Sequence, residues 1–569
     1  MIRPTVVAIL MSVIVPMLAL AQTTDELTND DKTPGDVLTY GMGYSQQRFS
    51  PLTRINRDNV KRLVPAWSYS MADNRGQEAQ PLVKDGIIYL TDHEKTVALD
   101  ALSGHAIWKA MIEYPPETTR VVCCGIVNRG GALFDGKLYR ATLDAHVIAL
   151  DIKTGKEVWR TKSSDPKEGY SMTAAPLVAN GVVIVGVAGA EFGHRGYLEG
   201  LDPQTGKQLW RTYTIPAPGE PGSETWPGDS GLHGGGSTWI TGSYDPELDL
   251  VFWGTGNPAP WNPLLRQGDN LYTNSILAIR PKTGKVVWHY QMTPNDPFDY
   301  DGVNELVQAD LTIDGAPRKV VMQANRNGFL YVIERATGKL LAASKFVKVN
   351  WAERVDMATG RPVWTEVTKG ALEGKSVQVW PHLTGGKNWH PMSYSPLSKL
   401  IYMNTMAFGW DYQPLPREEV ANLKPGQPHY GIKRPFVYLF DDPNGRGYLR
   451  AIDPLTGQSK WAVPFKSPNF AGTLVTASSL VFTGRLTGEF MAVDAETGKT
   501  LWEFQTSAGV VGQPITWELN GQQYVTVTNG ATGPYVMRSG DPNLANVPAG
   551  GSVWTFKLFE EYSGPQRGN

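Results

Sequence analysis

Hydrophobic and polar positions alternate along the chain in a short unit that repeats. The unit consists of an apolar residue, Asp, two variable residues, Thr-Gly, three further residues and Trp. Its copies span 98–108, 149–159, 200–210, 278–288, 451–461 and 492–502, and a weaker copy at 332–342 has lost its tryptophan. Thr-Gly between two apolar runs predicts a β-hairpin whose glycine has a positive φ. Two more strand-like runs precede each copy, so a unit has about four short strands, the size of one propeller blade.

The tail of the chain supplies an incomplete eighth unit. Strand-like runs at 512–521, 522–530 and 551–560 have no outermost partner, whereas 62–70 reads as an unpaired strand ending near a matching tryptophan, Trp67. Pairing 62–70 with the tail closes the ring and removes both open edges. We therefore expect an all-β fold, a single eight-bladed β-propeller over residues 22–569. The repeated tryptophans are expected to be scaffold residues that dock one blade on the next: Trp108, Trp159, Trp210, Trp288, Trp461 and Trp502.

Three long segments interrupt the repeats, at 216–236, at about 344–386 and at 410–436. Long loops of a rigid scaffold are where binding and catalytic residues gather. These segments are candidates for a cap over one mouth of the propeller channel.

Composition narrows the function. The 569 residues carry a formal charge of −2, and 19% of them are charged, which argues against a nucleic-acid partner and against a polybasic membrane surface. The 60 glycines, 41 prolines and 18 tryptophans suit a turn-rich β protein.

The first 21 residues have the layout of a cleavable secretory signal. Arg3 precedes an apolar run from Val6 to Leu20, and Ala-Leu-Ala ends at Ala21. A membrane anchor is the weaker alternative, because the run is short and Pro16 interrupts it. The mature chain has no other candidate membrane span, and we expect it to be a soluble protein of the periplasm.

The chain has only two cysteines, Cys123 and Cys124, and they are adjacent. Neighbouring cysteines cannot link distant strands, and a ring closed across one peptide bond adds little to stability. An accidental pair of reduced thiols is one interpretation. An exported protein, however, reaches a compartment in which a disulfide persists.

Two polar residues stand out in apolar surroundings. Glu191 lies in a run of small residues at 186–193, where it faces either a ligand or metal, or solvent on a surface loop. Asn257 ends an apolar strand, where its amide could bind a hard cation; an Asx-turn before Pro258 is the alternative.

Charged residues cluster at two further places. Asp299 and Asp301 point the same way if their segment is extended, and close carboxylates repel unless a cation or a shared proton relieves them. The alternative is an acidic surface loop. Arg326 stands on a tight turn at 324–328.

Several familiar motifs are absent from the sequence. It contains no dinucleotide-binding GxGxxG between a strand and a helix, no Cys-x-x-Cys-His for covalent haem, no HExxH and no Gly-x-Ser-x-Gly. A nicotinamide site, a bound haem and a serine hydrolase site are therefore unsupported.

The tryptophan phrase, the Cys-Cys pair and the stretch DYDGVNE at 299–305 together resemble the pyrroloquinoline quinone (PQQ) alcohol dehydrogenases, the quinoproteins that include methanol dehydrogenase large subunits. The resemblance covers essentially the mature chain. It implies oxidation of an alcohol to an aldehyde or ketone, with PQQ, one metal ion and a separate soluble cytochrome c as electron acceptor. It leaves a homodimer open.

The resemblance also implies residue roles. A Cys123-Cys124 disulfide covers one face of the quinone and Trp239 stacks on the other. Asp299 is the catalytic base and Arg326 acts beside it at the reactive carbonyl. Further cofactor contacts are Glu78, Arg129, Thr173, Ala188, Gly189, Ala190 and Asn388. The metal ligands are Glu191, Asn257, Asp299 and Asp301.

Two positions bear on the subtype. Phe470 stands where the family often has a tryptophan, which removes an indole donor and puts a cofactor contact there in doubt. Asp301 resembles the lanthanide enzymes, and three carboxylates suit a trivalent ion better than calcium. The alternatives are a calcium-dependent relative acting on bulkier or secondary alcohols, and a non-catalytic exported propeller that serves as a scaffold.

Overall fold

The computed structural model describes residues 22–120, 122, 125–420, 424, 426–434, 436–531, 539 and 541–559. The predicted signal peptide, 1–21, and the pair Cys123 and Cys124 lie outside the described residues. The described part is strand-rich and includes the short helices α1 (Thr24–Thr28) and α2 (Glu366–Leu372). The all-β prediction is therefore confirmed.

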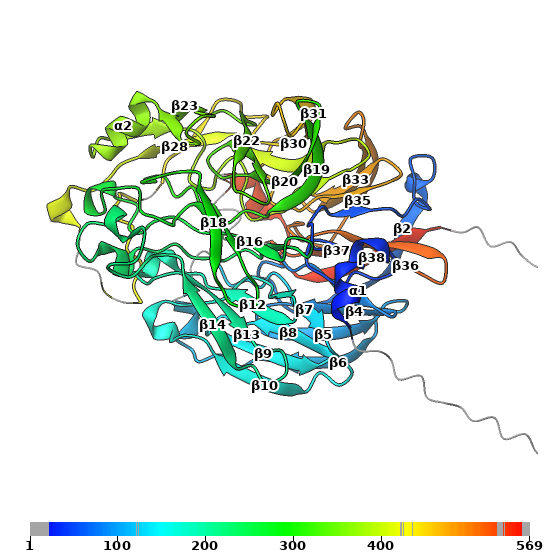
Figure 1. Ribbon diagram of the computed structural model, residues 1–569. Coiled ribbons are helices and arrows are strands. Elements are labelled where there is room, and N and C mark those ends of the chain that lie inside the picture. Colours follow the sequence, from blue (N-terminus) through cyan, green and yellow to red (C-terminus); the bar gives the residue numbers. More distant parts are fainter. Residues whose placement is uncertain are drawn as a thin grey trace, which may run out of the picture.

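Within the described residues, eight sheets of four or five strands follow one another around the molecule (Figure 1). The first three comprise β3 (Leu82–Lys84), β4 (Ile87–Thr91), β5 (Lys95–Asp100) and β6 (Ala106–Met111); β7 (Ala132–Phe134), β8 (Lys137–Ala141), β9 (His146–Asp151) and β10 (Glu157–Lys162); and β11 (Leu177–Ala179), β12 (Val182–Gly186), β13 (Tyr197–Leu201) and β14 (Gln208–Tyr213). The next two comprise β15 (Ser243–Asp245), β16 (Leu250–Gly254), β17 (Ser275–Ile279) and β18 (Val286–Gln291); and β19 (Val307–Ile313), β20 (Ala316–Ala324), β21 (Phe329–Glu334) and β22 (Leu340–Lys345).

The last three sheets depart from this simple order. The sixth comprises β26 (Ser393–Tyr394), β27 (Ile401–Met406), β30 (Gly447–Ile452) and β31 (Ser459–Phe465). The seventh comprises β32 (Leu474–Thr476), β33 (Leu480–Gly484), β34 (Glu489–Asp494) and β35 (Thr500–Gln505), with β1 (Phe49–Ser50) parallel to β32. The eighth comprises β36 (Ile515–Leu519), β37 (Gln522–Asn529), β38 (Ser552–Leu558) and β2 (Leu63–Ser70). Because β2 pairs antiparallel with β38, the predicted pairing of 62–70 with the tail is confirmed.

The repeated tryptophans join each sheet to its neighbour. Each indole Nε1 donates to a backbone carbonyl of an adjoining sheet over 2.8–3.1 Å: Trp67 to Ala101, Trp108 to Ile152, Trp159 to Pro203, Trp210 to Pro281, Trp288 to Arg335, Trp461 to Ala495 and Trp502 to Leu63. The weak repeat has Ala342 instead, and there Ser344 Oγ reaches Leu455 O at 3.3 Å. The scaffold role predicted for the tryptophans is confirmed.

The Thr-Gly glycines lie under these indoles. Gly155 has φ +69°, and a Cβ added to it would lie 2.4 Å from the Trp108 ring. Gly136 has φ +70°, with nothing within 4 Å of the corresponding position. The glycine of the repeat is therefore needed for its conformation and also for contact with the neighbouring sheet.

A matched pair of substitutions separates these two needs. Gly155→Ala and Gly136→Ala impose the same left-handed strain, but only the first forces an atom into Trp108. We expect Gly155→Ala to destabilise the protein by about 1–3 kcal/mol more than Gly136→Ala. Midpoints of urea denaturation measure the difference, and equal midpoints would refute the packing role.

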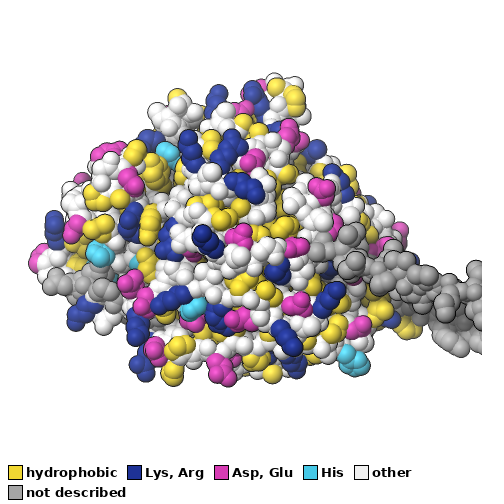
Figure 2. Space-filling model, turned by 60° about the horizontal axis from the view of Figure 1, so that its bottom comes forward, with side chains coloured by type: hydrophobic (Ala, Val, Ile, Leu, Met, Phe, Trp, Pro, Cys, Tyr) yellow, Lys and Arg dark blue, Asp and Glu magenta, His cyan; other side chains and the backbone are white. Residues whose placement is uncertain are grey.

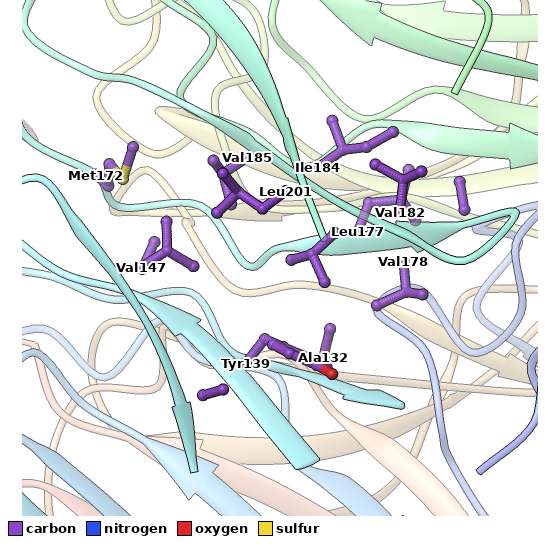
Figure 3. Close-up of a cluster of buried hydrophobic side chains, with 14 of the residues drawn as sticks. Ala132, Tyr139, Val147, Met172, Leu177, Val178, Val182, Ile184, Val185 and Leu201 are labelled. Atoms are coloured by element: carbon purple, nitrogen blue, oxygen red, sulfur yellow. The ribbon is translucent and has the colours of Figure 1, made fainter. Parts of the chain in front are cut away.

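Apolar side chains fill the space between successive sheets. Figure 3 shows Tyr139 and Val147 of the second sheet facing Leu177, Val185 and their neighbours of the third. The Tyr139 hydroxyl also donates to Pro203 O at 3.0 Å. This packing makes the sheets a rigid support for the loops at their ends.

The three long segments contain structure of their own. Within 344–386, β23 (Ala352–Val355) and β24 (Pro362–Trp364) form a hairpin beside α2. The strands β25 (Val377–Val379), β28 (Phe408–Tyr412) and β29 (Tyr438–Phe440) form a separate sheet. The described face in Figure 2 intersperses basic and acidic side chains, in agreement with the nearly neutral composition.

Candidate active site

The predicted site residues that the structure describes all lie at the same end of their sheets. Glu78, Arg129, Thr173, Trp239, Asp299, Asp301 and Asn388 precede the first strand of a sheet, whereas Ala188, Gly189, Ala190, Glu191, Asn257 and Arg326 follow a second strand. In an antiparallel pair the start of the first strand lies beside the end of the second. Sheet topology therefore brings residues far apart in the sequence to one mouth.

Arg326 joins the two predicted carboxylates. Its Nη1 donates to Asp299 Oδ2 at 3.1 Å and to Asp299 O at 2.9 Å, while its Nη2 lies 2.9 Å from Asp301 Oδ2. All three side chains are buried. The alternative of an acidic surface loop is therefore wrong.

The reason given for the convergence of the carboxylates needs correction. Asp299 has φ +63°, in the left-handed region, so the segment is not the extended strand that would place both side chains on one face. The neighbouring Asp296 shapes the turn instead, because its carboxylate accepts the backbone N–H of Phe298 and Tyr300. Such a conformation in a non-glycine residue is uncommon and clusters at functional sites.

Glu191 and Asn257 lie beside this pair. The Asn257 backbone N–H donates to Asp301 Oδ1 at 2.6 Å, and both Glu191 and Asn257 are buried. Burial raises the pKa of Glu191, and the charge of Asp301 raises it further. A hydrogen bond from Asn257 has the opposite effect and lowers this pKa. The surface-loop interpretation of Glu191 is therefore wrong. Asn257 Nδ2 also donates to Pro258 O at 3.1 Å. Asn257 therefore makes a local contact and is at the same time buried beside Asp301.

The group has an excess of negative charge. Burial raises the pKa of Asp299 well above its ordinary value, and Asp301 and Glu191 add to this effect, while Arg326 opposes it. Burial also raises the pKa of Asp301, again opposed by Arg326. One arginine facing three buried carboxylates leaves a site that fits a hard cation with oxygen ligands.

A second group of residues forms a place for a flat anionic ligand. Arg129 Nη2 lies 2.6 Å from Glu78 Oε2, and the guanidinium lies 4.9 Å from the Trp239 ring centroid. Arg326 lies over the same ring at 5.4 Å, and Trp239 Nε1 donates to Asp301 Oδ2 at 3.1 Å. Among the described residues, Arg129 Nε and Nη1 and Arg326 Nε are buried without a hydrogen-bond partner. Buried guanidinium donors of this kind suit a ligand with carboxylate or carbonyl oxygens.

The remaining predicted contacts surround this place through the backbone. Thr173 O accepts the Arg129 N–H at 3.0 Å, and Ala188 N donates to Ser171 O at 2.7 Å. Gly189 has φ +107°, and a Cβ there would lie 2.3 Å from Gly169 O, so only glycine fits.

Asn388 is held by its own turn, with Nδ2 donating to Thr384 O at 2.8 Å and Oδ1 accepting Trp389 N. Phe470 is buried and stacks on Trp389, with ring centroids 6.3 Å apart. The Phe470 ring therefore packs against Trp389, the residue that follows Asn388.

Sequence reasoning missed an aromatic group at the edge of the site. Tyr430 lies against Trp261, with ring centroids 4.8 Å apart, and the His429 N–H donates to Glu191 O at 2.7 Å. The only sequence signal was the long segment 410–436, predicted as a cap without any assigned residue.

Another group of possible metal ligands lies outside this site. Asp73, Asp92 and His93 place ligand atoms within 4.8 Å of one another. Arg75 pairs with Asp73 at 2.9 Å, and Lys95 with Asp92 at 3.4 Å. Because both carboxylates already have a basic partner, this group is better described as a network of ion pairs. No described helix is long and apolar enough to cross a membrane.

Known proteins share both the sequence and the fold. The family described as glucose/ethanol/alcohol dehydrogenase with a PQQ β-propeller domain matches residues 38–350 and 438–525. The quinohemoprotein alcohol dehydrogenase ADH IIB of Pseudomonas putida is 42% identical over 92% of this chain and 78% of its own. The quinoprotein alcohol dehydrogenase PedH, from a strain of the same species, is 41% identical over 95% of this chain and 93% of its own.

A solved structure supports the same relationship. The chain described as a europium-containing methanol dehydrogenase superposes with a TM-score of 0.88 at 35% identity, covering 94% of this chain and all of that one. The chain belongs to the family of PQQ-dependent alcohol dehydrogenases and has a β-propeller fold.

Proposed function

We propose that this enzyme is a periplasmic quinoprotein that oxidises an alcohol to an aldehyde or ketone and passes the electrons to a separate cytochrome c. The observation that carries the proposal is the buried group of Asp299, Asp301 and Arg326 beside Glu191 and the Trp239 ring. It combines a proton acceptor, a cation site and a flat aromatic surface at one mouth.

Each residue has a role that follows from its contacts. PQQ supplies the two-electron oxidant, and a bound cation supplies a Lewis acid. Asp299 accepts the proton of the alcohol hydroxyl on its carboxylate, which Arg326 orients from 3.1 Å. Trp239 would offer an aromatic face to the cofactor, and the buried Arg129 donors without a partner would bind its carboxylates. Cys123 and Cys124 form, in this proposal, a disulfide on the opposite face.

The metal is proposed to be a lanthanide ion held by Glu191, Asn257, Asp299 and Asp301. The three buried carboxylates of the site, besides the cofactor's own, suit a trivalent ion better than a divalent one. The europium-containing methanol dehydrogenase, a 35% identical neighbour, gives further support. Calcium is the alternative, with bulkier or secondary alcohols as substrates.

The architecture is proposed to be a closed ring of eight blades. The pairing of β2 with β38 supports it, and so do the tryptophan bonds that lead from sheet to sheet and return through Trp502 to Leu63. Residues 1–21 are proposed to direct export and to be removed.

Reconstitution tests the function. Purified protein is supplied with PQQ and either La³⁺ or Ca²⁺, then assayed with primary and secondary alcohols and a redox dye. Activity with at least one metal is expected. Inactivity with both metals would favour the alternative of a non-catalytic scaffold. That alternative also predicts that the ultraviolet-visible spectrum of the purified protein shows no bound quinone.

Cation binding is expected to release protons. The pKa values of Glu191, Asp299 and Asp301 are all raised in the metal-free protein, so part of this group still carries protons at pH values where ordinary carboxyls have lost them. A cation favours the ionised forms and displaces those protons. Because raising the pH removes the protons beforehand, the release must decrease as pH rises.

Calorimetric titration with La³⁺ in two buffers of different ionisation enthalpy measures the release. Glu191→Gln is the matched variant, since it removes one titrating group from the site and must release fewer protons. A release that does not change with pH would contradict the charge distribution described for the site.

A further inference from the structure

A strap formed by residues 426–434 lies against the loops that carry Glu191 and Asn262. At its start, a Cβ on Gly426 would lie 2.3 Å from Lys167 O, so the backbone meets the loop that enters the third sheet. The His429 N–H donates to Glu191 O at 2.7 Å, and Gly431 O accepts Asn262 Nδ2 at 3.0 Å. The strap is therefore fastened to the loops of both the third and the fourth sheet.

Tyr430 lies between these two attachments. Its ring is 4.8 Å from the Trp261 ring, with an interplanar angle of 59°, and Arg434 lies over it at 5.0 Å. Trp261 is itself fixed, because it is buried and its carbonyl accepts the Tyr412 hydroxyl at 3.1 Å. The position of the Tyr430 ring is thus set by neighbours on the strap and on the scaffold.

Tyr430 lies near the buried carboxylates, because the preceding residue, His429, donates its N–H to Glu191 O. The Tyr430 side chain is partly exposed, whereas Glu191 and Asp299 are buried. Burial raises the pKa of Tyr430 to about 12. The negative charges of Glu191 and Asp299 add to this rise, whereas Arg434 opposes it. Tyr430 is therefore near both carboxylates, at the side of the site where the strap meets the Glu191 loop.

We propose that Tyr430 determines substrate specificity: with Trp261 it forms an aromatic wall that admits primary alcohols with an unbranched apolar chain and excludes those substituted at the carbinol carbon. This inference rests on the proposed function. The rings of Tyr430 and Trp261 are both held by their neighbours, and they offer dispersion contacts to the alkyl chain of an alcohol. The faces of these rings carry no hydrogen-bond donors that would compete with such contacts. A second substituent on the carbon next to Asp299 is forced against Tyr430.

The isomers 1-butanol and 2-butanol test the wall, because they have the same composition and differ only at the carbinol carbon. Wild-type protein loaded with PQQ and metal is expected to favour 1-butanol in kcat/KM. Tyr430→Ala should lower that preference by about tenfold, and Tyr430→Trp should raise it. Tyr430→Phe keeps the ring and should keep the preference. Tyr69→Ala, on the ring-closing strand β2, is the matched control, for which no change is expected.

The outcomes separate the two proposals. Wild-type protein that is inactive on both butanols with either metal overturns the proposed function. Active wild-type protein whose preference is unchanged in Tyr430→Ala overturns the inference alone. If Tyr430→Ala does not fold, Tyr430→Trp decides, since an unchanged or lowered preference in that variant equally overturns the inference. A loss of kcat alone, equal for both alcohols, indicates a structural role and also overturns it.

Discussion

Asp299→Asn is expected to lower kcat by about a thousandfold in protein loaded with PQQ and metal. Asparagine has nearly the same shape and still offers an oxygen to Arg326 Nη1, which lies 3.1 Å from Asp299 Oδ2. It cannot take up a proton, however, so the alcohol hydroxyl loses its acceptor while the turn is preserved. Steady-state assays with a dye acceptor at saturating alcohol measure the effect.

Two accompanying measurements make the result specific to proton transfer. Asp310→Asn changes an exposed carboxylate on β19, paired with Arg335, and should leave kcat unchanged. Cofactor and metal content must be determined for each variant, because Asp299 also belongs to the proposed cation site. If fully loaded Asp299→Asn keeps more than about a tenth of the wild-type kcat, another group accepts the proton.

The repeating phrase predicted the sheets well because it encodes a local structure together with a tertiary contact. Its Asp and Thr-Gly residues form the hairpin turn, as at Asp151, whose Oδ1 accepts both the N–H and the hydroxyl of Thr154. Its tryptophan then bonds to the same position of the next unit. Periodicity records both features, so strands and scaffold residues could be predicted from sequence.

One further copy shows the limit of that signal. Residues 354–364 contain Asp356, Thr359, Gly360 and Trp364 in the same spacing, and Asp356 Oδ1 accepts the Thr359 N–H and hydroxyl. This copy is not among the repeats counted above. It forms the separate hairpin β23–β24, which lies outside the eight main sheets. The phrase therefore specifies a hairpin, and only the preceding strands decide whether that hairpin completes a sheet.

The site could be predicted only in part. Unusual residues such as Glu191 and Asp301 are visible in the sequence, and the family resemblance assigns them roles. The left-handed turn at Asp299 is not visible, because it depends on Asp296 and on Arg326, which is 27 residues away. Tyr430 is beyond sequence reasoning altogether, since its partner Trp261 lies in the distant loop between β16 and β17 and neither residue has a repeat position that would reveal the contact.

Asp301 is the proposed determinant of the choice of metal, and its replacement is expected to change that choice. Its Oδ1 accepts the Asn257 N–H, while its Oδ2 accepts Trp239 Nε1 and pairs with Arg326 Nη2 at 2.9 Å. Asp301 therefore contributes a charge and also positions two neighbours. The attraction between a carboxylate and a cation is proportional to the charge of the cation. The loss of one carboxylate therefore weakens the binding of a trivalent ion more than the binding of a divalent ion.

Asp301→Ala is expected to weaken La³⁺ activation by about a hundredfold, while activation by Ca²⁺ changes much less. Asp301→Asn separates the two contributions, because its amide oxygen can still accept from Trp239 or Asn257 but carries no charge. If charge determines the metal, both variants lose the lanthanide preference together. If Asp301 acts only by positioning Asn257 and Trp239, Asp301→Asn keeps activation by both metals, and Asp301→Ala loses activation by both metals alike without a change of preference. Titrations of activity against each metal, starting from metal-free protein with PQQ present, distinguish these results, and an unchanged preference in both variants would assign the selectivity to Glu191 and Asp299 alone.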